Sequence, residues 1–450
     1  MSIKIFRPAS VLLMGFSSLL FELTHLSIFE FFVRFFALIA ILSFLPYLTK
    51  VPKILIISLL GVSSILYVVN GSLYEGFIGL NMNATILMIF IFVPLLSIPI
   101  KFGDYLTQIN NVLTKYMKST IRLYLFIKFS VLGVGSIMGM GTVPLIYHLT
   151  NTKVVRLYQP LQISAIGRGF SLSFLWSPYY ISIAFMISYY NVNWIEIAPF
   201  GLVFTLLGTI VGVILLRKYN QKLEVSLDRN YDGKKAKKKL LELVSIIALI
   251  TFVSIIIDSQ VDQSMLTVIS LVAIITSFIW SLFFQSFKSY LQSLYQFTQE
   301  RVPAMGNELS LFIAAGVIGH AILISGADQL MMIFLDTVGV THTLVVIPVV
   351  SMVILVFSYI GVLSIVPITV VTIALSASPL YMDDHLILAL GTLLIWSITV
   401  VSSPFSGVNL LMASLTKKNP FEYGLKLNLK FSIVFWITGY LALVVIYYLI

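Results

Sequence analysis

Residues 177–193 read SPYYISIAFMISYYNVN, and residues 403–419 read SPFSGVNLLMASLTKKN. Serine, proline, methionine, serine and asparagine recur in the two stretches at one offset, 226 residues. Each stretch sets a proline inside an apolar segment, where proline removes a backbone N–H and clashes with the carbonyl four residues earlier. The pair therefore predicts two interrupted helices at equivalent places in an internal repeat.

The composition around these stretches is that of a membrane protein. Of the 450 residues, 59% are hydrophobic and only 10% are charged, with a mean hydropathy of +1.02. The apolar runs are continuous rather than alternating, which predicts an all-α polytopic membrane protein and excludes a transmembrane β-barrel. The chain has no cysteine, which excludes disulfides, thiolate metal sites and a cysteine nucleophile.

Apolar runs predict about eleven transmembrane helices. Two of the spans, 160–190 and 385–414, contain the Ser-Pro sites. Two further runs, 121–150 and 344–376, are too long for one crossing and carry the interruptions GVGSIMGMGTVP and SYIGVLSIVP, so we expect two re-entrant hairpins. The remaining spans are 8–24, 29–48, 53–70, 83–101, 197–216, 240–257, 264–284, 306–325 and 430–449.

The distribution of charge supports this topology. With the N-terminus inside and both hairpins returning to their side of entry, every Lys and Arg except Arg34 and Arg168 falls on the cytoplasmic side. The positive-inside rule accounts for the net charge of +10 without a nucleic-acid partner. We therefore expect a multi-pass protein of a bacterial cytoplasmic membrane, with its C-terminus outside.

Further pairs of residues extend the repeat. Asn83 and Asn307, and Asp104 and Asp328, are each 224 apart, and Pro144 and Pro367 are 223 apart. By the charge count the two hairpins enter from opposite sides, which predicts an inverted-topology repeat. The expected organisation is an N-terminal helix outside the repeat (1–28), a first repeat (29–216), a basic cytoplasmic linker (217–239) and a second repeat (240–450).

The breaks have a chemical consequence. Interrupted backbone in a bilayer is tolerated only where it is buried in protein or lines a cavity. The freed carbonyl and N–H groups can hold an ion or an anionic group near the midplane. The candidate residues for binding substrate or an ion are hydroxyls, one amide, the prolines and one cation: Ser136, Thr142, Arg168, Ser173, Ser177, Pro178, Ser358, Ser364, Thr369, Ser402, Ser403, Pro404 and Asn409.

Three ionisable residues in apolar spans have alternative interpretations. Arg168 could neutralise an anionic substrate, or its head group could reach the lipid headgroups from a site near the helix end. Glu308 and His320 share one span, twelve residues apart, and could serve a proton-coupled mechanism. Glu308 could equally be an interfacial carboxylate favoured by the helix dipole.

This arrangement resembles the ion transporter superfamily, which includes divalent-anion/sodium symporters, arsenite permeases, citrate- and gluconate-type permeases and the large subunits of tripartite carboxylate transporters. The resemblance covers the chain after residue 28, and residues 177–183 (SPYYISI) and 403–409 (SPFSGVN) look like the family's Thr-Pro-Pro-Asn-type breaks. It implies a homodimer with an elevator-type motion. Sodium-coupled dicarboxylate members carry Ser-Asn-Thr at both hairpin tips, where this chain has GMGTVP and LSIVP.

The sequence thus predicts a secondary active transporter of a small, carboxylate-like solute, coupled to H⁺ or Na⁺. Apart from such an ion we expect no cofactor and no enzymatic activity. Two other functions remain open: an integral membrane enzyme acting on a lipid-linked saccharide or acyl substrate, and a channel or subunit of a larger complex. The substrate, the coupling ion and the direction of transport stay open.

Overall fold

The computed structural model describes residues 3–105, 107–108, 119–222, 233–261, 263–326, 333, 337 and 339–450. The regular structure of these residues is helical, apart from one isolated bridge between Ser119 and Lys222. Ten of their helical segments are long and apolar enough to cross a membrane. The prediction of an all-α polytopic membrane protein is therefore confirmed, and apolar runs without alternation are the physical reason for it.

The chain folds into two compact units that interleave along the sequence. Unit 1 comprises Met1–Ile98, Ala184–Val192 and Ser254–Leu388. In unit 1 the helix α18 packs against α3, α5 and α21, while α1 packs against α2. Its elements are α1 (Ile3–Thr24), α2 (Ser27–Phe44), η1 (Leu45–Tyr47), α3 (Lys50–Val69), α4 (Leu73–Gly79), α5 (Ala84–Phe92), η2 (Val93–Leu96), α15 (Met265–Leu282), α16 (Phe287–Gln296), η5 (Phe297–Arg301), α17 (Val302–Ala304), α18 (Gly306–Ser325), α20 (Thr343–Tyr359), α21 (Ile365–Ser376) and η6 (Pro379–Asp384).

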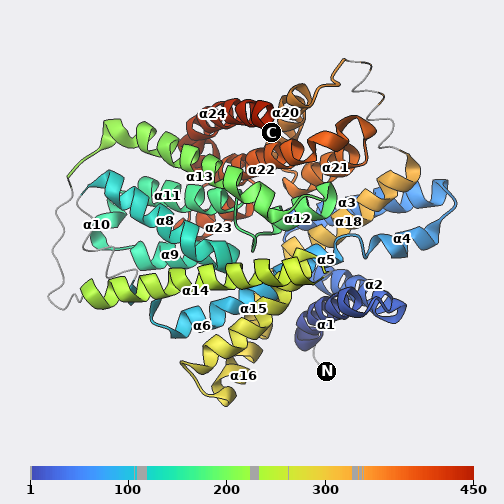
Figure 1. Ribbon diagram of the computed structural model, residues 1–450, viewed down its shortest axis with the longest axis horizontal. Helices are drawn as coiled ribbons and strands as arrows, with labels where there is room; N and C mark the ends of the chain where they lie inside the picture. The colour runs from blue at the N-terminus through green and yellow to red at the C-terminus, as the bar shows by residue number, and fades with distance from the viewer. Residues whose placement is uncertain are drawn as a thin grey trace. The chain divides into compact units, whose positions relative to one another are not determined.

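Unit 2 comprises Pro99–Ile183, Asn193–Val253 and Ala389–Ile450. Its elements are α8 (Thr120–Met138), η3 (Gly139–Gly141), α9 (Thr142–Thr150), α10 (Lys153–Arg156), α11 (Gln159–Ser173), α13 (Trp194–Leu216), η4 (Arg217–Tyr219), α23 (Gly407–Thr416), η7 (Glu422–Leu427) and α24 (Asn428–Leu449). The helices α8, α9 and α11 lie side by side, and α13 packs on α24 (Figure 1). Four helices contain a boundary between the units: α6 (Ser97–Phe102), α12 (Ile181–Tyr190), α14 (Gly233–Gln260) and α22 (His385–Ser402).

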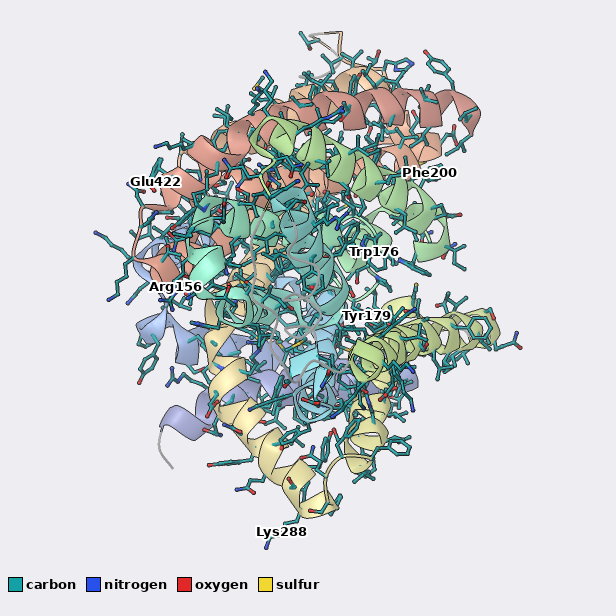
Figure 2. All side chains as sticks on the ribbon, turned by 90° about the vertical axis from the view of Figure 1, so that its left-hand side faces the viewer. Arg156, Trp176, Tyr179, Phe200, Lys288 and Glu422 are labelled. Atoms are coloured by element: carbon teal, nitrogen blue, oxygen red, sulfur yellow. The ribbon has the colours of Figure 1, made fainter. Side chains whose placement is uncertain are left out.

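Many helix ends lie within a few residues of the apolar runs. The span expected at 306–325 is α18, Gly306–Ser325, and the span expected at 53–70 is α3, Lys50–Val69. Lys288, near the start of α16, is exposed and projects away from the ribbon in Figure 2. Burial of apolar side chains against neighbouring helices or lipid decides these boundaries, so continuous hydropathy locates them well.

The segment 120–150 begins and ends at the same end of unit 2. It turns at Gly139, whose φ of +56° favours glycine, and α9 packs back on α8. At the start of α8, Thr120 N donates to Gln221 O (3.1 Å). After α9, Tyr158 Oη donates to Gln221 Oε1 (3.3 Å). The chain on both sides of this helix–turn–helix therefore contacts Gln221.

The segment 343–376 has the same design in unit 1. The helices α20 and α21 pack on each other around a turn that contains Gly361, with φ +110°. Thr343, the first residue of α20, hydrogen-bonds Asp384, which follows α21. Tyr381 Oη donates to Val340 O (3.1 Å). The chain before and after this segment thus also meets at one end.

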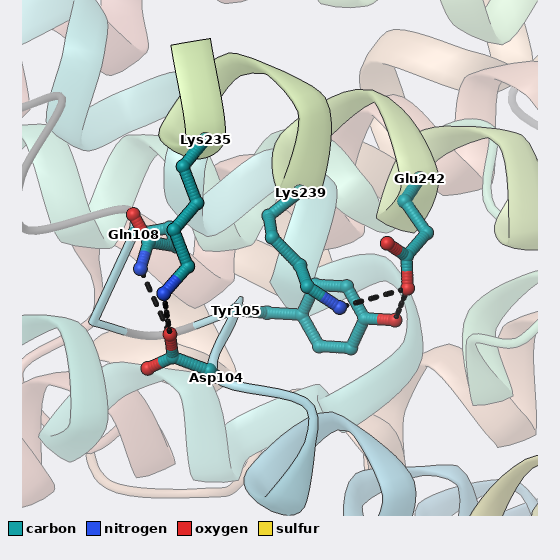
Figure 3. Close-up of polar contacts among 6 residues, drawn as sticks. All are labelled: Asp104, Tyr105, Gln108, Lys235, Lys239 and Glu242. Atoms are coloured by element: carbon teal, nitrogen blue, oxygen red, sulfur yellow. Dashed lines mark hydrogen bonds and ion pairs between the residues drawn. The ribbon is translucent and has the colours of Figure 1, made fainter. Parts of the chain in front are cut away.

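The basic linker is anchored by polar contacts in unit 2. Its last residues already belong to α14, which begins at Gly233. Tyr105 Oη donates to Glu242 Oε1 (2.5 Å), and Lys239 Nζ contacts the same carboxylate (3.1 Å; Figure 3). Lys235 Nζ lies 4.0 Å from Asp104 Oδ2. Residues 223–232 of the linker, and Asp328 of the repeat, lie outside the described residues.

Candidate functional site

The helix is interrupted at the first Ser-Pro site. Helix α11 ends at Ser173 and α12 begins at Ile181, and all the residues between except Trp176 are buried. Pro178 has no N–H to give to Phe174 O, the carbonyl four residues earlier. Ser182 Oγ donates to this carbonyl instead (2.8 Å). The side chain thus takes over the hydrogen bond that the proline removes.

The second Ser-Pro site is built in a similar way. Helix α22 ends at Ser402 and α23 begins at Gly407. Asn409 Nδ2 donates both to Val401 O (3.0 Å) and to Ser403 O (2.9 Å). Asn409 is 2% exposed, and its amide supplies the side-chain donor for the buried Val401 O and a second donor for Ser403 O, which also accepts the N–H of Ser406.

The backbone follows one pattern at both sites. Each serine N–H donates to the carbonyl four residues earlier, Ser177 to Ser173 (3.2 Å) and Ser403 to Thr399 (2.9 Å). Each serine Oγ accepts the N–H two residues later, from Tyr179 (3.3 Å) and from Phe405 (3.2 Å). Each serine carbonyl accepts the N–H three residues later, at 3.1 Å in both cases. The repeat in sequence is therefore a repeat in local structure.

A glycine from the next part of the chain packs directly on each break. A Cβ at Gly201 of α13 would lie 1.9 Å from Leu175 O and 3.2 Å from Trp176 Cα. A Cβ at Gly424 of η7 would lie 2.4 Å from Ser402 O. The two glycines are 223 residues apart. Sequence reasoning missed this pair, although the repeat offset could have found it.

Equivalent residues of the two halves touch each other inside unit 2. Ser397 Oγ of α22 donates to Ser171 O of α11 (2.8 Å), and these residues are 226 apart, as are the two Ser-Pro sites. Helices α13 and α24, which follow the two breaks, also pack together. Residues near a pseudo-twofold axis must meet their own counterparts, so this contact is what such an axis requires.

The first helix–turn–helix supplies further polar groups to the first break. Ser177 Oγ donates to Ser136 O (2.9 Å), and Ser173 Oγ lies 3.5 Å from Leu132 O. Thr142 is fully buried, and its Oγ1 has no hydrogen-bond partner in the part of the chain that the structure describes. The structure therefore brings Ser136, Ser173 and Ser177 together, as the sequence suggested. Beside them, Tyr179 Oη lies 2.8 Å from Thr251 Oγ1 of α14, within hydrogen-bond distance.

The second helix–turn–helix belongs to the other unit. Ser358 Oγ donates to Ser364 Oγ (3.1 Å), so the two residues lie together at the turn between α20 and α21. Thr369 Oγ1 donates to Ile365 O of its own helix (2.8 Å). Ser402, Ser403, Pro404 and Asn409 lie together at the second break in unit 2.

Arg168 is buried but does not face the breaks. Its Nε donates to Asn428 Oδ1 (2.9 Å), its Nη2 donates to Leu427 O (3.1 Å), and its Cζ lies 4.4 Å from the ring centre of Phe431. With only 4% of its surface exposed, it does not reach out to lipid headgroups. It holds α11 against the start of α24.

Lys128 is a buried cation that the sequence did not single out. The charge pattern counts it with the cytoplasmic lysines, and in the structure Lys128 is fully buried in the middle of α8. Its Nζ hydrogen-bonds Thr209 Oγ1 of α13. A lone lysine within an apolar run could have predicted a buried cation at this position.

Glu308 and His320 do not come together, because twelve residues of α18 hold them about 18 Å apart. Glu308 lies in the first turn of α18, and its Oε2 has no hydrogen-bond partner among the described residues. His320 instead lies between Tyr67 Oη (3.1 Å from Nδ1) and Glu75 Oε2 (3.5 Å from Nε2). The structure therefore pairs His320 with Glu75 and not with Glu308.

The described residues contain no cluster of three or more His, Cys, Asp or Glu side chains that could hold a metal ion. What the arrangement offers is hydroxyls, an amide and interrupted backbone, which can bind a polar solute or an alkali cation. No protein-family model matches the chain, and no curated protein is significantly similar to it, so the two matched breaks in unit 2 stand as the features that guide a functional assignment.

Proposed function

We propose that the protein is a secondary active transporter that moves a small, anionic solute across the cytoplasmic membrane. The observation that carries this proposal is the matched pair of Ser-Pro breaks in unit 2, linked by the hydrogen bond between Ser397 and Ser171. Two helices interrupted in the same way, whose freed carbonyls accept hydrogen bonds from buried side chains, are expected of a binding site and are not needed for a simple scaffold.

The proposal includes two opposed re-entrant hairpins, 120–150 and 343–376. Helices α9 and α21, with 9 and 12 residues, would be about 13 Å and 18 Å long, too short to cross a hydrocarbon core of about 30 Å. The contacts of Gln221, and of Thr343 with Asp384, support the return of each hairpin to its own end. Inverted repeats of this kind allow alternating access by an elevator-type motion, and we propose a homodimer as the moving assembly.

Either H⁺ or Na⁺ could drive such a transporter, and the two ions would use different residues. For Na⁺ the ligands would be hydroxyls and carbonyls at the breaks, with Ser136, Ser177 and Ser403 as candidates. For H⁺ the candidates are His320 and Glu75, which lie in contact in unit 1. We propose no resident cofactor, no catalytic step and no nucleic-acid partner.

The test is thermal unfolding of the purified protein with a panel of carboxylates, sugar acids, inorganic oxyanions and neutral solutes, with and without Na⁺ and at two pH values. A ligand of the folded state raises the apparent melting temperature. Solutes that do so are then tested for ion-gradient-driven uptake into proteoliposomes. Pro178→Ala and Pro404→Ala restore a backbone donor at each break, so we expect both to weaken the solute response at least ten-fold.

Pro199→Ala is the matched control, because Pro199 lies inside α13 without interrupting it. This variant should keep the full solute response. A protein that responds to no solute on the panel, or that binds a solute without moving it, contradicts the transporter. If no solute on the panel raises the melting temperature and the protein acts on a lipid-linked saccharide, the membrane-enzyme alternative is favoured instead.

A further inference from the structure

Two basic side chains lie at one depth inside unit 2. Helices α8 and α11 start at the same end, because Thr120 and Tyr158 both contact Gln221. Lys128 and Arg168 follow these starts by eight and nine residues, which places both about 12–13 Å along their helices. A Cβ at Gly169 would lie 2.6 Å from Lys128 O, so the two helices are in close contact at this level.

Neither cation has an anionic partner within the described part of the chain. Lys128 Nζ hydrogen-bonds Thr209 Oγ1, whose own proton goes to Thr205 O (2.7 Å). Arg168 has an amide, a carbonyl and the face of Phe431 as partners. Their side chains make no ion pair with a described carboxylate. Two buried cations without a counter-charge are strongly unfavourable away from water.

Hydrogen-bond donors remain unused at the same place. Arg168 Nη1 and Tyr124 Oη are buried, and neither makes a well-formed hydrogen bond to another described residue. Tyr124 lies one turn before Lys128 on the same face of α8, and its ring centre is 5.8 Å from Arg168 Cζ. A protonated Lys128 would have donors beyond the one bound to Thr209. The free donors and the uncompensated charge thus belong to one cluster of three side chains, Tyr124, Lys128 and Arg168.

We infer that Tyr124, Lys128 and Arg168 bind a compact oxyanion, the carboxylate-like group of the transported solute. An anion of this kind supplies the missing charge and accepts hydrogen bonds from all three side chains. The inference rests on the proposed function for the identity of the ligand. It goes further in locating the anionic group among α8, α11 and α13, away from the Ser-Pro breaks.

The experiment measures thermal unfolding of the purified full-length protein in sodium acetate, succinate, sulfate or phosphate, against sodium chloride at equal ionic strength. We expect at least one of these anions to raise the melting temperature saturably. Lys128→Met keeps the length of the side chain without its charge, and Tyr124→Phe removes only a hydroxyl. Both variants should weaken the apparent anion affinity at least ten-fold. Lys430→Met removes an exposed charge from α24 and should leave the affinity unchanged.

The outcomes separate this inference from the proposed function. If anions still raise the melting temperature of Lys128→Met and Tyr124→Phe but not that of Pro178→Ala, the three-residue anion site is wrong and the proposed transport function stands. An anion response that depends on Lys128, in a protein that transports none of the panel, supports the cluster and contradicts the transporter. No response of the unaltered protein to any of the four anions overturns the inference.

Discussion

At the scale of single residues, the two breaks depend on side chains that replace lost backbone hydrogen bonds. Proline makes the interruption, and a buried serine or asparagine makes it tolerable, because a carbonyl without a partner in a bilayer is costly. Ser182 donates one hydrogen bond to a carbonyl at its break, and Asn409 donates two. The stability of each break should therefore depend on the hydrogen bonds that its side chain donates.

Replacing these side chains tests that relation. Asn409→Leu removes two side-chain hydrogen bonds and Ser182→Ala removes one, and each variant takes the side-chain donor from a buried carbonyl, Val401 O or Phe174 O, at about 1–3 kcal/mol for such an acceptor. We expect both variants to lower the melting temperature of the purified protein, with the larger fall for Asn409→Leu. Equal falls, or none, would show that water or other side chains satisfy these carbonyls.

Asp104 predicts a pH dependence outside the membrane-spanning segments. Hydrogen bonds from Gln108 and Thr107, with smaller contributions from Lys235 and Lys239, lower the pKa of Asp104 below its ordinary value of 3.8. The folded state therefore favours the carboxylate. Its stabilisation is present above pH 3.8 and is lost as the pH falls through the lower, folded-state pKa. The side chain is 43% exposed, so the effect should stay below about 1 kcal/mol.

The measurement compares Asp104→Asn with the unaltered protein from pH 7 to pH 3. Asparagine tolerates the φ of +60° at this position, so the substitution changes mainly the charge. The unaltered protein should be the more stable of the two at neutral pH, and the difference should vanish in acid. A difference that is constant with pH would mean that the ionisation of Asp104 contributes nothing.

At the scale of helices, each break is held by a glycine in the element that follows it. Gly201 and Gly424 let the backbone of α13 and η7 approach the interrupted segments more closely than any side chain would allow. These contacts involve backbone atoms on the facing segment, which cannot move aside without displacing the break. The prolines thus interrupt the helices, and the glycines allow the close packing that holds the interrupted segments in place.

Alanine at either glycine should be strongly unfavourable. Gly201→Ala and Gly424→Ala each force the helix away from the break, which we expect to destabilise the protein by about 1–3 kcal/mol or more. The matched control is Gly61→Ala in α3, where an added Cβ meets nothing within 4 Å. Alanine there should raise the stability by up to about 1 kcal/mol through helix propensity. Thermal unfolding of the three variants checks this order.

The helices could be located from sequence because apolar burial is continuous along them, as α18 illustrates. Lys128 lies alone in an apolar run, which could have marked it as a buried cation, but its partner Thr209 on α13 could not be predicted from local sequence. The separation of Glu308 from His320 follows from helical rise, yet the pairing of His320 with Glu75 depends on how α4 packs, which no local pattern encodes. Local sequence patterns thus predicted the two helix breaks but not the contacts between elements that are far apart in the chain.

At the scale of the whole molecule, the central prediction is the inverted repeat itself. The repeat requires that each hairpin begin and end on one side of the membrane, and that the two hairpins use opposite sides. The contacts of Gln221 in unit 2, and of Thr343 with Asp384 in unit 1, are the structural reason to expect the first condition. The opposite sides follow from the positive-inside rule.

Single cysteines test the topology directly, because the chain has no cysteine of its own. Arg122→Cys and Leu157→Cys flank the first hairpin at exposed positions, and Thr341→Cys and Ala377→Cys flank the second. In intact cells a membrane-impermeant thiol reagent should label Thr341→Cys and Ala377→Cys, and should reach Arg122→Cys and Leu157→Cys only after permeabilisation. If the two members of either pair label from opposite sides, that segment crosses the membrane. Every later loop then changes sides, and the inverted repeat is lost together with the single central site that it would create.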